Sequence, residues 1–146
     1  MKKFIQLTCI LLISLTTTSP LFSSEEIIKG RQEIFSKNYN TAKAVSTAIK
    51  SGDNEKAKEL LEEVSKNFNT LLKYFPEDSK TGFDTEALPA IWENSDEFVT
   101  LMQNASSNAL MLAKKLDDDT ADITSLEKEL LWNNCSACHK KFRLKK

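Results

Sequence analysis

The chain has 146 residues, with 20 Lys and Arg side chains, 21 Asp and Glu side chains and a formal net charge of −1. This near-neutral balance does not indicate a nucleic-acid or anionic-membrane partner. With only three glycines and three prolines, the composition excludes a low-complexity chain and indicates a single ordered domain.

The first 24 residues have the pattern of a secretory signal peptide. Two lysines precede an apolar run over residues 4–15, and small polar residues follow it. The run is shorter than the roughly 20 residues that span a bilayer, which favours cleavage over an uncleaved N-terminal anchor. We therefore expect a signal peptide over residues 1–24, one domain over residues 25–146, and a periplasmic protein without membrane attachment after cleavage. Cys9 would leave with the signal.

The first half of the mature chain predicts two amphipathic helices, because its apolar residues repeat with a period of 3.6. The first helix covers about residues 26–50. Residues 51–53, Ser-Gly-Asp, then indicate a helix end followed by a new start. The second helix covers about residues 54–74 and ends before Pro76, since proline cannot continue the hydrogen-bond ladder.

The second half predicts two more helices after a long connection over residues 76–88. Pro89 is favoured in a first helical turn, and residues 117–120 offer caps for a fourth helix that runs through Ile123 into the C-terminal end. The third helix has the spacing of a bundle seam, with expected core positions Ile91, Ser95, Phe98, Met102, Ala105, Ala109, Leu112 and Leu116. Short loops join the first helix to the second and the third helix to the fourth. This pattern predicts an all-α, antiparallel four-helix bundle.

The C-terminal end carries a Cys-x-x-Cys-His string at residues 135–139, the pattern that attaches c-type haem. Cys135 and Cys138 lie three residues apart, so on a helix both thiols face the same way and can form two thioether bonds with one porphyrin. His139 is the only histidine in the chain, and its imidazole can bind the iron. We therefore expect one covalent haem c near the C-terminal end of the fourth helix.

Over the whole mature chain the sequence resembles cytochrome c′, a family of class II c-type cytochromes. The resemblance rests on four strings in order: residues 31–35 (Arg-Gln-Glu-Ile-Phe), 75–79 (Phe-Pro-Glu-Asp-Ser), 87–92 (Ala-Leu-Pro-Ala-Ile-Trp) and 135–143 (Cys-Ser-Ala-Cys-His-Lys-Lys-Phe-Arg). It implies a four-helix bundle, a homodimer, electron transfer or binding of small gases such as nitric oxide, and an unidentified redox partner protein.

The resemblance also implies roles for particular residues. Arg31 and Gln32 would lie by the haem propionates, and Phe35 would cover the distal face. Arg143 would lie beside the axial His139. Ser79 matches a weaker haem-contact position of the family.

The sequence predicts a five-coordinate, high-spin ferrous iron. Low-spin relatives use a methionine of the first helix as a second axial ligand, and here Phe35 holds the matching position. Met102 is the one core methionine of the third helix, where packing is favoured over a role as sixth ligand. The expected distal pocket is apolar, suits nitric oxide or carbon monoxide, and has no obvious hydrogen-bond donor for dioxygen.

Other interpretations of the same residues make different predictions. A haem enzyme, such as a peroxidase or a nitric-oxide reductase, is an alternative, although peroxidase chemistry favours a distal acid–base histidine that this chain lacks. The two cysteines are also compatible with a dithiol redox pair, which usually follows a strand. A zinc site would need a fourth ligand besides the two cysteines and the histidine.

Overall fold

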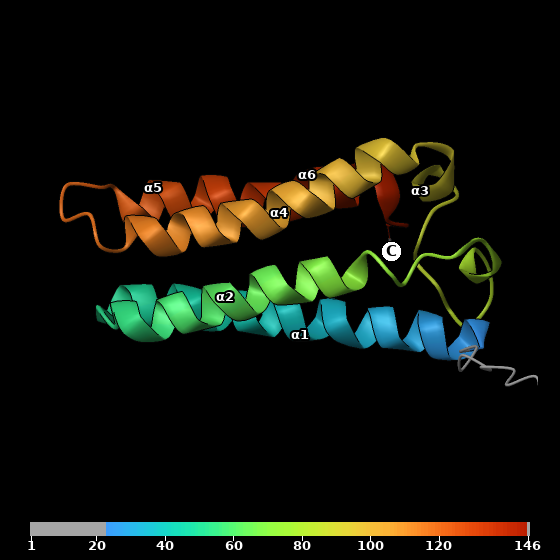
Figure 1. Cartoon of the computed structure of the whole chain (residues 1–146), viewed down its shortest axis with the longest axis horizontal. Helices are drawn as coiled ribbons and strands as arrows, with labels where there is room; N and C mark the ends of the chain where they lie inside the picture. Colours follow the sequence, from blue (N-terminus) through green and yellow to red (C-terminus); the bar gives the residue numbers. More distant parts are fainter. Residues whose placement is uncertain (1–22, 146) are drawn as a thin grey trace, which may run out of the picture.

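The computed structural model describes residues 23–145 and contains two antiparallel helix pairs (Figure 1). Helices α1 (Ser24–Ser51) and α2 (Asn54–Leu71) form the first pair. Helix α4 (Ser95–Lys115) pairs with the continuous helical stretch of α5 (Ile123–Glu127), the π-helical turn η2 (Lys128–Trp132) and α6 (Asn133–Phe142). The predicted all-α, antiparallel four-helix bundle is confirmed.

The first pair is delimited by caps that the sequence indicates. The Ser23 hydroxyl accepts a hydrogen bond from the Glu26 N–H at 3.3 Å, and the Glu26 carboxylate accepts one from the Ser23 N–H at 2.8 Å. Gly52 ends α1 in the left-handed conformation, with φ +74°, and Asp53 caps α2. The predicted signal segment, residues 1–24, lies outside the described residues except for its last two.

The third helix differs from its prediction, because it consists of two helices. Helix α3 (Ala90–Glu93) stops at Asn94, whose backbone leaves the helical region (φ −127°, ψ 49°). The Asn94 amide donates a hydrogen bond to the Ala90 carbonyl at 3.2 Å, so this side chain competes with the helical ladder. Ser95 is consequently exposed rather than in the core. The other seven expected core positions of this segment are buried.

Two further boundaries differ from their predictions by a few residues. Helix α2 ends at Leu71, and the next backbone N–H groups pair three residues back instead of four, as at Tyr74 with the Leu71 carbonyl (2.9 Å). This tightening precedes Pro76, which disfavours helical backbone in the residue before it. The fourth helix is capped by Asp122, which accepts from the Ser125 N–H, and not by residues 117–120.

The long connection and the C-terminal segment meet at the end of the bundle where α1 begins and α6 finishes (Figure 1). The connection contains the short 3-10 turn η1 (Glu77–Ser79). The Leu88 N–H donates to the Phe142 carbonyl at 3.0 Å, and the Leu144 N–H donates to the Glu86 carbonyl at 2.8 Å. Between residues 23 and 145, no helix combines the length and the apolar character needed to cross a membrane.

Candidate functional site

The two cysteines of the C-terminal string lie on α6 as free, half-buried thiols. Burial raises the pKa of the Cys138 thiol to about 11 and also raises the pKa of Cys135. Dithiol redox centres have the opposite property, a lowered thiol pKa that stabilises the thiolate. Cys138 packs against the hydrophobic core. Two neutral thiols against an apolar interior are typical of residues that contact an apolar porphyrin edge. They are not typical of a dithiol redox centre.

His139 is exposed and lies in the last turn of α6. It lines a hollow of about 520 Å³ whose other walls are Ser136, Lys140, Arg143, Leu144 and Lys145. Desolvation lowers the pKa of His139, the positive charge of Arg143 lowers it further, and the carboxylate of Glu86 opposes both. The imidazole is therefore neutral near pH 7, and the neutral form is the one that binds a metal.

Arg143 joins this end of α6 to the connection. Its guanidinium forms an ion pair with the Glu86 carboxylate at 2.7 Å, and Ala87 and Arg143 form an isolated β-bridge. The Arg143 N–H also donates to the His139 carbonyl at 3.3 Å. The structure therefore places Arg143 one helical turn after His139, at the end of α6.

Arg31 is a buried cation of α1 that holds the connection in place. Its Nη1 donates to Ser79 Oγ at 2.8 Å and to the Tyr74 carbonyl at 3.2 Å, while its Nη2 donates to the Ser79 carbonyl at 2.8 Å and to Thr85 Oγ1 at 2.7 Å. Burial lowers its pKa to about 10, so the side chain stays charged at neutral pH. The guanidinium also lies 4.9 Å from the centre of the Phe75 ring.

Gln32 and Ser79 contact the same connection. The Gln32 amide donates to the Asp84 carbonyl at 3.2 Å, and Ser79 is fully buried, with its hydroxyl donating to the Pro76 carbonyl at 2.9 Å. Arg31 and Ser79 are thus in direct contact, and Gln32 lies one residue further along α1. In this structure the three side chains order the connection.

A series of aromatic rings joins the α1 residues to α6. Phe35 contacts Phe75 with ring centres 6.4 Å apart, Phe75 contacts Phe98 at 4.7 Å, and Phe98 contacts Phe142 at 5.3 Å. Phe35 is partly buried against the core. The structure therefore brings the predicted residues together in two groups at one end of the bundle, one on α1 and the connection and one on α6.

The two methionines within residues 23–145 occupy different environments. Met102 is 2% exposed and packs within the core of the bundle, whereas Met111 is 50% exposed. Helix α1, which supplies the second ligand in low-spin relatives, contains no methionine. Met102 therefore has the burial of a packing residue.

Three polar side chains make contacts that were not predicted from the sequence. Glu127 accepts a hydrogen bond from Trp132 Nε1 at 2.9 Å and another from the Ser46 hydroxyl, and Thr85 is a partner of Arg31. Asn38 is only 5% exposed, and its Nδ2 has no hydrogen-bond partner within the described part of the chain. The signal that reveals Asn38 in the sequence is its place on the apolar face of the first helix, one turn after Phe35.

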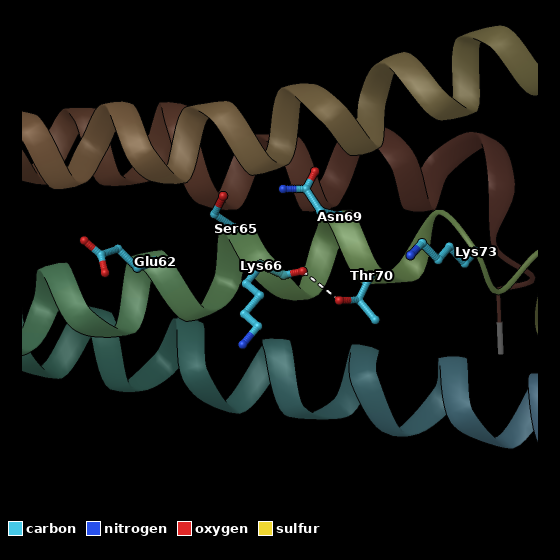
Figure 2. A pocket seen from close by; sticks show the side chains of 6 residues that line it. All are labelled: Glu62, Ser65, Lys66, Asn69, Thr70 and Lys73. Carbon is cyan, nitrogen blue, oxygen red and sulfur yellow. Dashed lines mark hydrogen bonds between the residues drawn. The ribbon is translucent and has the colours of Figure 1, made fainter.

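A second hollow, of about 510 Å³, lies along α2 and is lined by Glu62, Ser65, Lys66, Asn69, Thr70 and Lys73. Figure 2 shows that these side chains diverge, with Ser65 and Asn69 toward α4 and Lys66 toward α1. Thr70 Oγ1 donates to the backbone carbonyl of Lys66 at 3.0 Å. No set of groups converges on one point here, so this hollow is not a candidate site.

Comparison with known proteins identifies the family. The family model described as Cytochrome C' matches residues 26–143. The chain belongs to the cytochrome c′ family. Members of this family bind a covalently attached haem c, and haem c is accordingly the cofactor. The family and cofactor predicted from the sequence are confirmed.

Individual relatives in the cytochrome c′ family agree with this assignment. The chain is 35% identical to a cytochrome c-556 of Agrobacterium tumefaciens (strain II Chrys), over 70% of this chain and 82% of that protein. It is 29% identical to the cytochrome c′ of Rhodopseudomonas palustris, over 83% and 84%. A solved structure of the latter superposes with a TM-score of 0.71 at 30% identity, covering 83% of this chain and 98% of that chain. A cytochrome c′ of Thermochromatium tepidum, at 18% identity, shares the fold with a TM-score of 0.74 and covers 85% and 98%.

Proposed function

We propose that this cytochrome c′ family member transfers single electrons, reversibly binds nitric oxide or carbon monoxide, and turns over no substrate. The observation that carries the proposal is the joint presence on α6 of two half-buried thiols and the only histidine of the chain. When bound, haem c supplies an iron that alternates between the ferric and ferrous states and accepts diatomic ligands.

The residues of α6 attach and orient this group. Cys135 and Cys138 would hold the porphyrin through two thioether bonds, one from each sulfur to a vinyl group. His139 would supply a neutral imidazole nitrogen to the iron, since desolvation and then the nearby charge of Arg143 lower the imidazole pKa. These assignments are supported by the placement of all four residues on the last turns of the chain.

The residues of α1 and the connection form the opposite side of the site. Phe35 covers the distal face, and the iron stays five-coordinate because α1 has no methionine and Met102 is packed in the core. Arg31 and Gln32 lie at the same end of the bundle as α6 and are assigned to the propionates. Ser79, fully buried against Arg31, positions that cation.

Titration of the ferrous protein with carbon monoxide and with nitric oxide tests this function. We expect both gases to bind to the haem without prior loss of a protein ligand, with saturation at one carbon monoxide per chain. A ferrous spectrum that neither gas changes would contradict gas binding and leave only electron transfer. A peroxide turnover rate far above that of free haem would contradict the assignment as a carrier.

Replacing Phe35 by alanine is expected to accelerate carbon monoxide binding. The incoming gas must displace the phenyl ring, and a barrier lower by roughly 1.4 kcal/mol corresponds to about a tenfold faster association rate. Flash photolysis of the carbon monoxide complex measures this rate. The matched control is Phe83→Ala, which removes a phenyl ring that is 47% exposed in the connection. Equal rates in Phe35→Ala and the unmodified protein would remove Phe35 from the gas path.

The periplasmic location and the homodimer are further parts of the proposal. The pattern of residues 1–24 supports export, and membership of the cytochrome c′ family supports dimerisation. The mass of the protein purified from the periplasm gives the N-terminus, which we expect near Ser24 or Glu25. Light scattering of the haem-containing protein gives the oligomeric state, and a monomer at all concentrations would contradict the dimer.

A further inference from the structure

Asn38 is a buried amide in the middle of the core-facing side of α1. Its Oδ1 accepts a hydrogen bond from Asn67 Nδ2 of α2 at 2.9 Å, while its own Nδ2 is buried and has no partner among residues 23–145. An unpaired buried donor typically costs about 1–3 kcal/mol. Such groups are rare in native proteins and call for a specific explanation.

Contacts between α1 and the fourth helix place Phe35 near the level of Cys135 and Asn38 just before that level. Tyr39 packs edge-on against Trp132 with ring centres 6.3 Å apart. Two helical turns further along α1, the Ser46 hydroxyl donates a hydrogen bond to the Glu127 carboxylate. Because these helices run antiparallel (Figure 1), moving back along α1 corresponds to moving forward along α6. Residues 35–38 of α1 therefore lie opposite about residues 133–136, the segment that carries Cys135.

Phe35 and Asn38 are three residues apart, so they lie on the same side of α1, one turn from each other. The proposed function assigns Phe35 to the distal face. A neighbour on that face with a free N–H is the kind of group that can contact a ligand on the iron. The amide is also oriented, because Asn67 holds its oxygen and leaves its nitrogen available.

Resting on the proposed function, we propose that Asn38 Nδ2 donates a hydrogen bond to a diatomic ligand bound on the distal side, beyond the Phe35 ring. Asn38 is then a specificity-determining residue, because it favours a bound gas whose outer atom accepts a hydrogen bond. This proposal gives the distal pocket one hydrogen-bond donor, whereas the sequence predicts a pocket without an obvious donor.

The test uses the ferrous haem protein with carbon monoxide as the probe. Asn38→Leu keeps the number and branching of the side-chain heavy atoms and has no donor. We expect carbon monoxide to dissociate about two- to tenfold faster from it, as the loss of one hydrogen bond implies. A donor at the carbon monoxide oxygen strengthens back-donation from the iron and so lowers the frequency of the C–O stretch. In Asn38→Leu, which lacks this donor, the infrared C–O stretch should therefore move to higher frequency. A change in packing alone would not move the stretch in this direction.

Two further variants make the result specific. Asn40→Leu changes an exposed asparagine of the same helix, and both measurements should stay as in the unmodified protein. Asn38→Thr, which keeps a hydroxyl donor, should give an intermediate C–O stretch and serves if Asn38→Leu does not fold. A carbon monoxide complex of Asn38→Leu with unchanged stretch and rate would overturn the role of Asn38 alone. An unmodified protein that binds no carbon monoxide would overturn the proposed function as well.

Discussion

Replacing both Cys135 and Cys138 by serine is expected to abolish covalent attachment of the haem. Serine keeps the size of the side chain but does not add to the porphyrin vinyl groups, so both thioether bonds are lost. Any haem that remains would be held by His139 and packing contacts alone. Acidified organic solvent should then extract the haem from the double variant completely, whereas it should leave the haem of the unmodified protein on the polypeptide.

The single variants and a neighbouring control make this prediction specific. Cys135→Ser or Cys138→Ser alone should retain one thioether, which shifts the alkaline pyridine spectrum to that of a haem with one free vinyl group. Ser136→Ala lies between the two cysteines on the exposed side of α6 and should keep both bonds. Haem that resists extraction from the double variant would show that the attachment is elsewhere.

Replacing Arg31 by methionine is expected to lower the free energy of unfolding by about 3 kcal/mol, because each buried acceptor left without its donor costs about 1–3 kcal/mol. The substitution leaves Ser79, which is fully buried, and the Tyr74 carbonyl without this hydrogen-bond donor. It also removes the hydrogen bond that Thr85 Oγ1 accepts from the guanidinium. Urea unfolding of the haem-containing protein, followed by circular dichroism, measures the change.

Arg143→Met is the matched control for this prediction. Arg143 also pairs with the connection, through Glu86, but its side chain is 51% exposed, and exposed ion pairs contribute about 0–1 kcal/mol. The two variants remove the same charge and add the same side chain, so burial is the main difference between them. Equal stability of the two variants would show that the hydrogen bonds of Arg31 do not hold the connection.

The fold could be predicted from the sequence where the signal is repeated many times. Apolar residues recur over five or more turns in the first helix and in the segment that becomes α4, so single exceptions do not alter the result. Asn94 interrupts the predicted third helix without altering the bundle. Its side chain competes for one backbone carbonyl, and the spacing of apolar residues does not reveal this local effect. The same holds for the end of α2, which depends on the backbone geometry before Pro76.

The candidate site could be predicted where chemistry restricts the residue type. Only cysteine forms the thioether, and the chain has one histidine. Residues 135–139 could therefore be predicted as the haem attachment site from the sequence alone. The four hydrogen bonds of Arg31 could not be predicted, because Tyr74, Ser79 and Thr85 lie between the end of α2 and the start of α3, where the sequence has no regular period. The free donor of Asn38 depends on Asn67, a contact between two helices that spacing within one helix does not specify.

The visible spectrum of the purified ferrous protein, without added ligand, tests most directly whether the iron keeps an open axial position beside Phe35. A broad, high-spin spectrum is predicted, because the proposed function gives the iron His139 as its only protein ligand and Met102 is buried in the core. Sharp low-spin bands in the absence of any gas would contradict the account, since they require a second protein ligand on the iron. A colourless protein, purified from cells that mature c-type cytochromes, would contradict it more broadly.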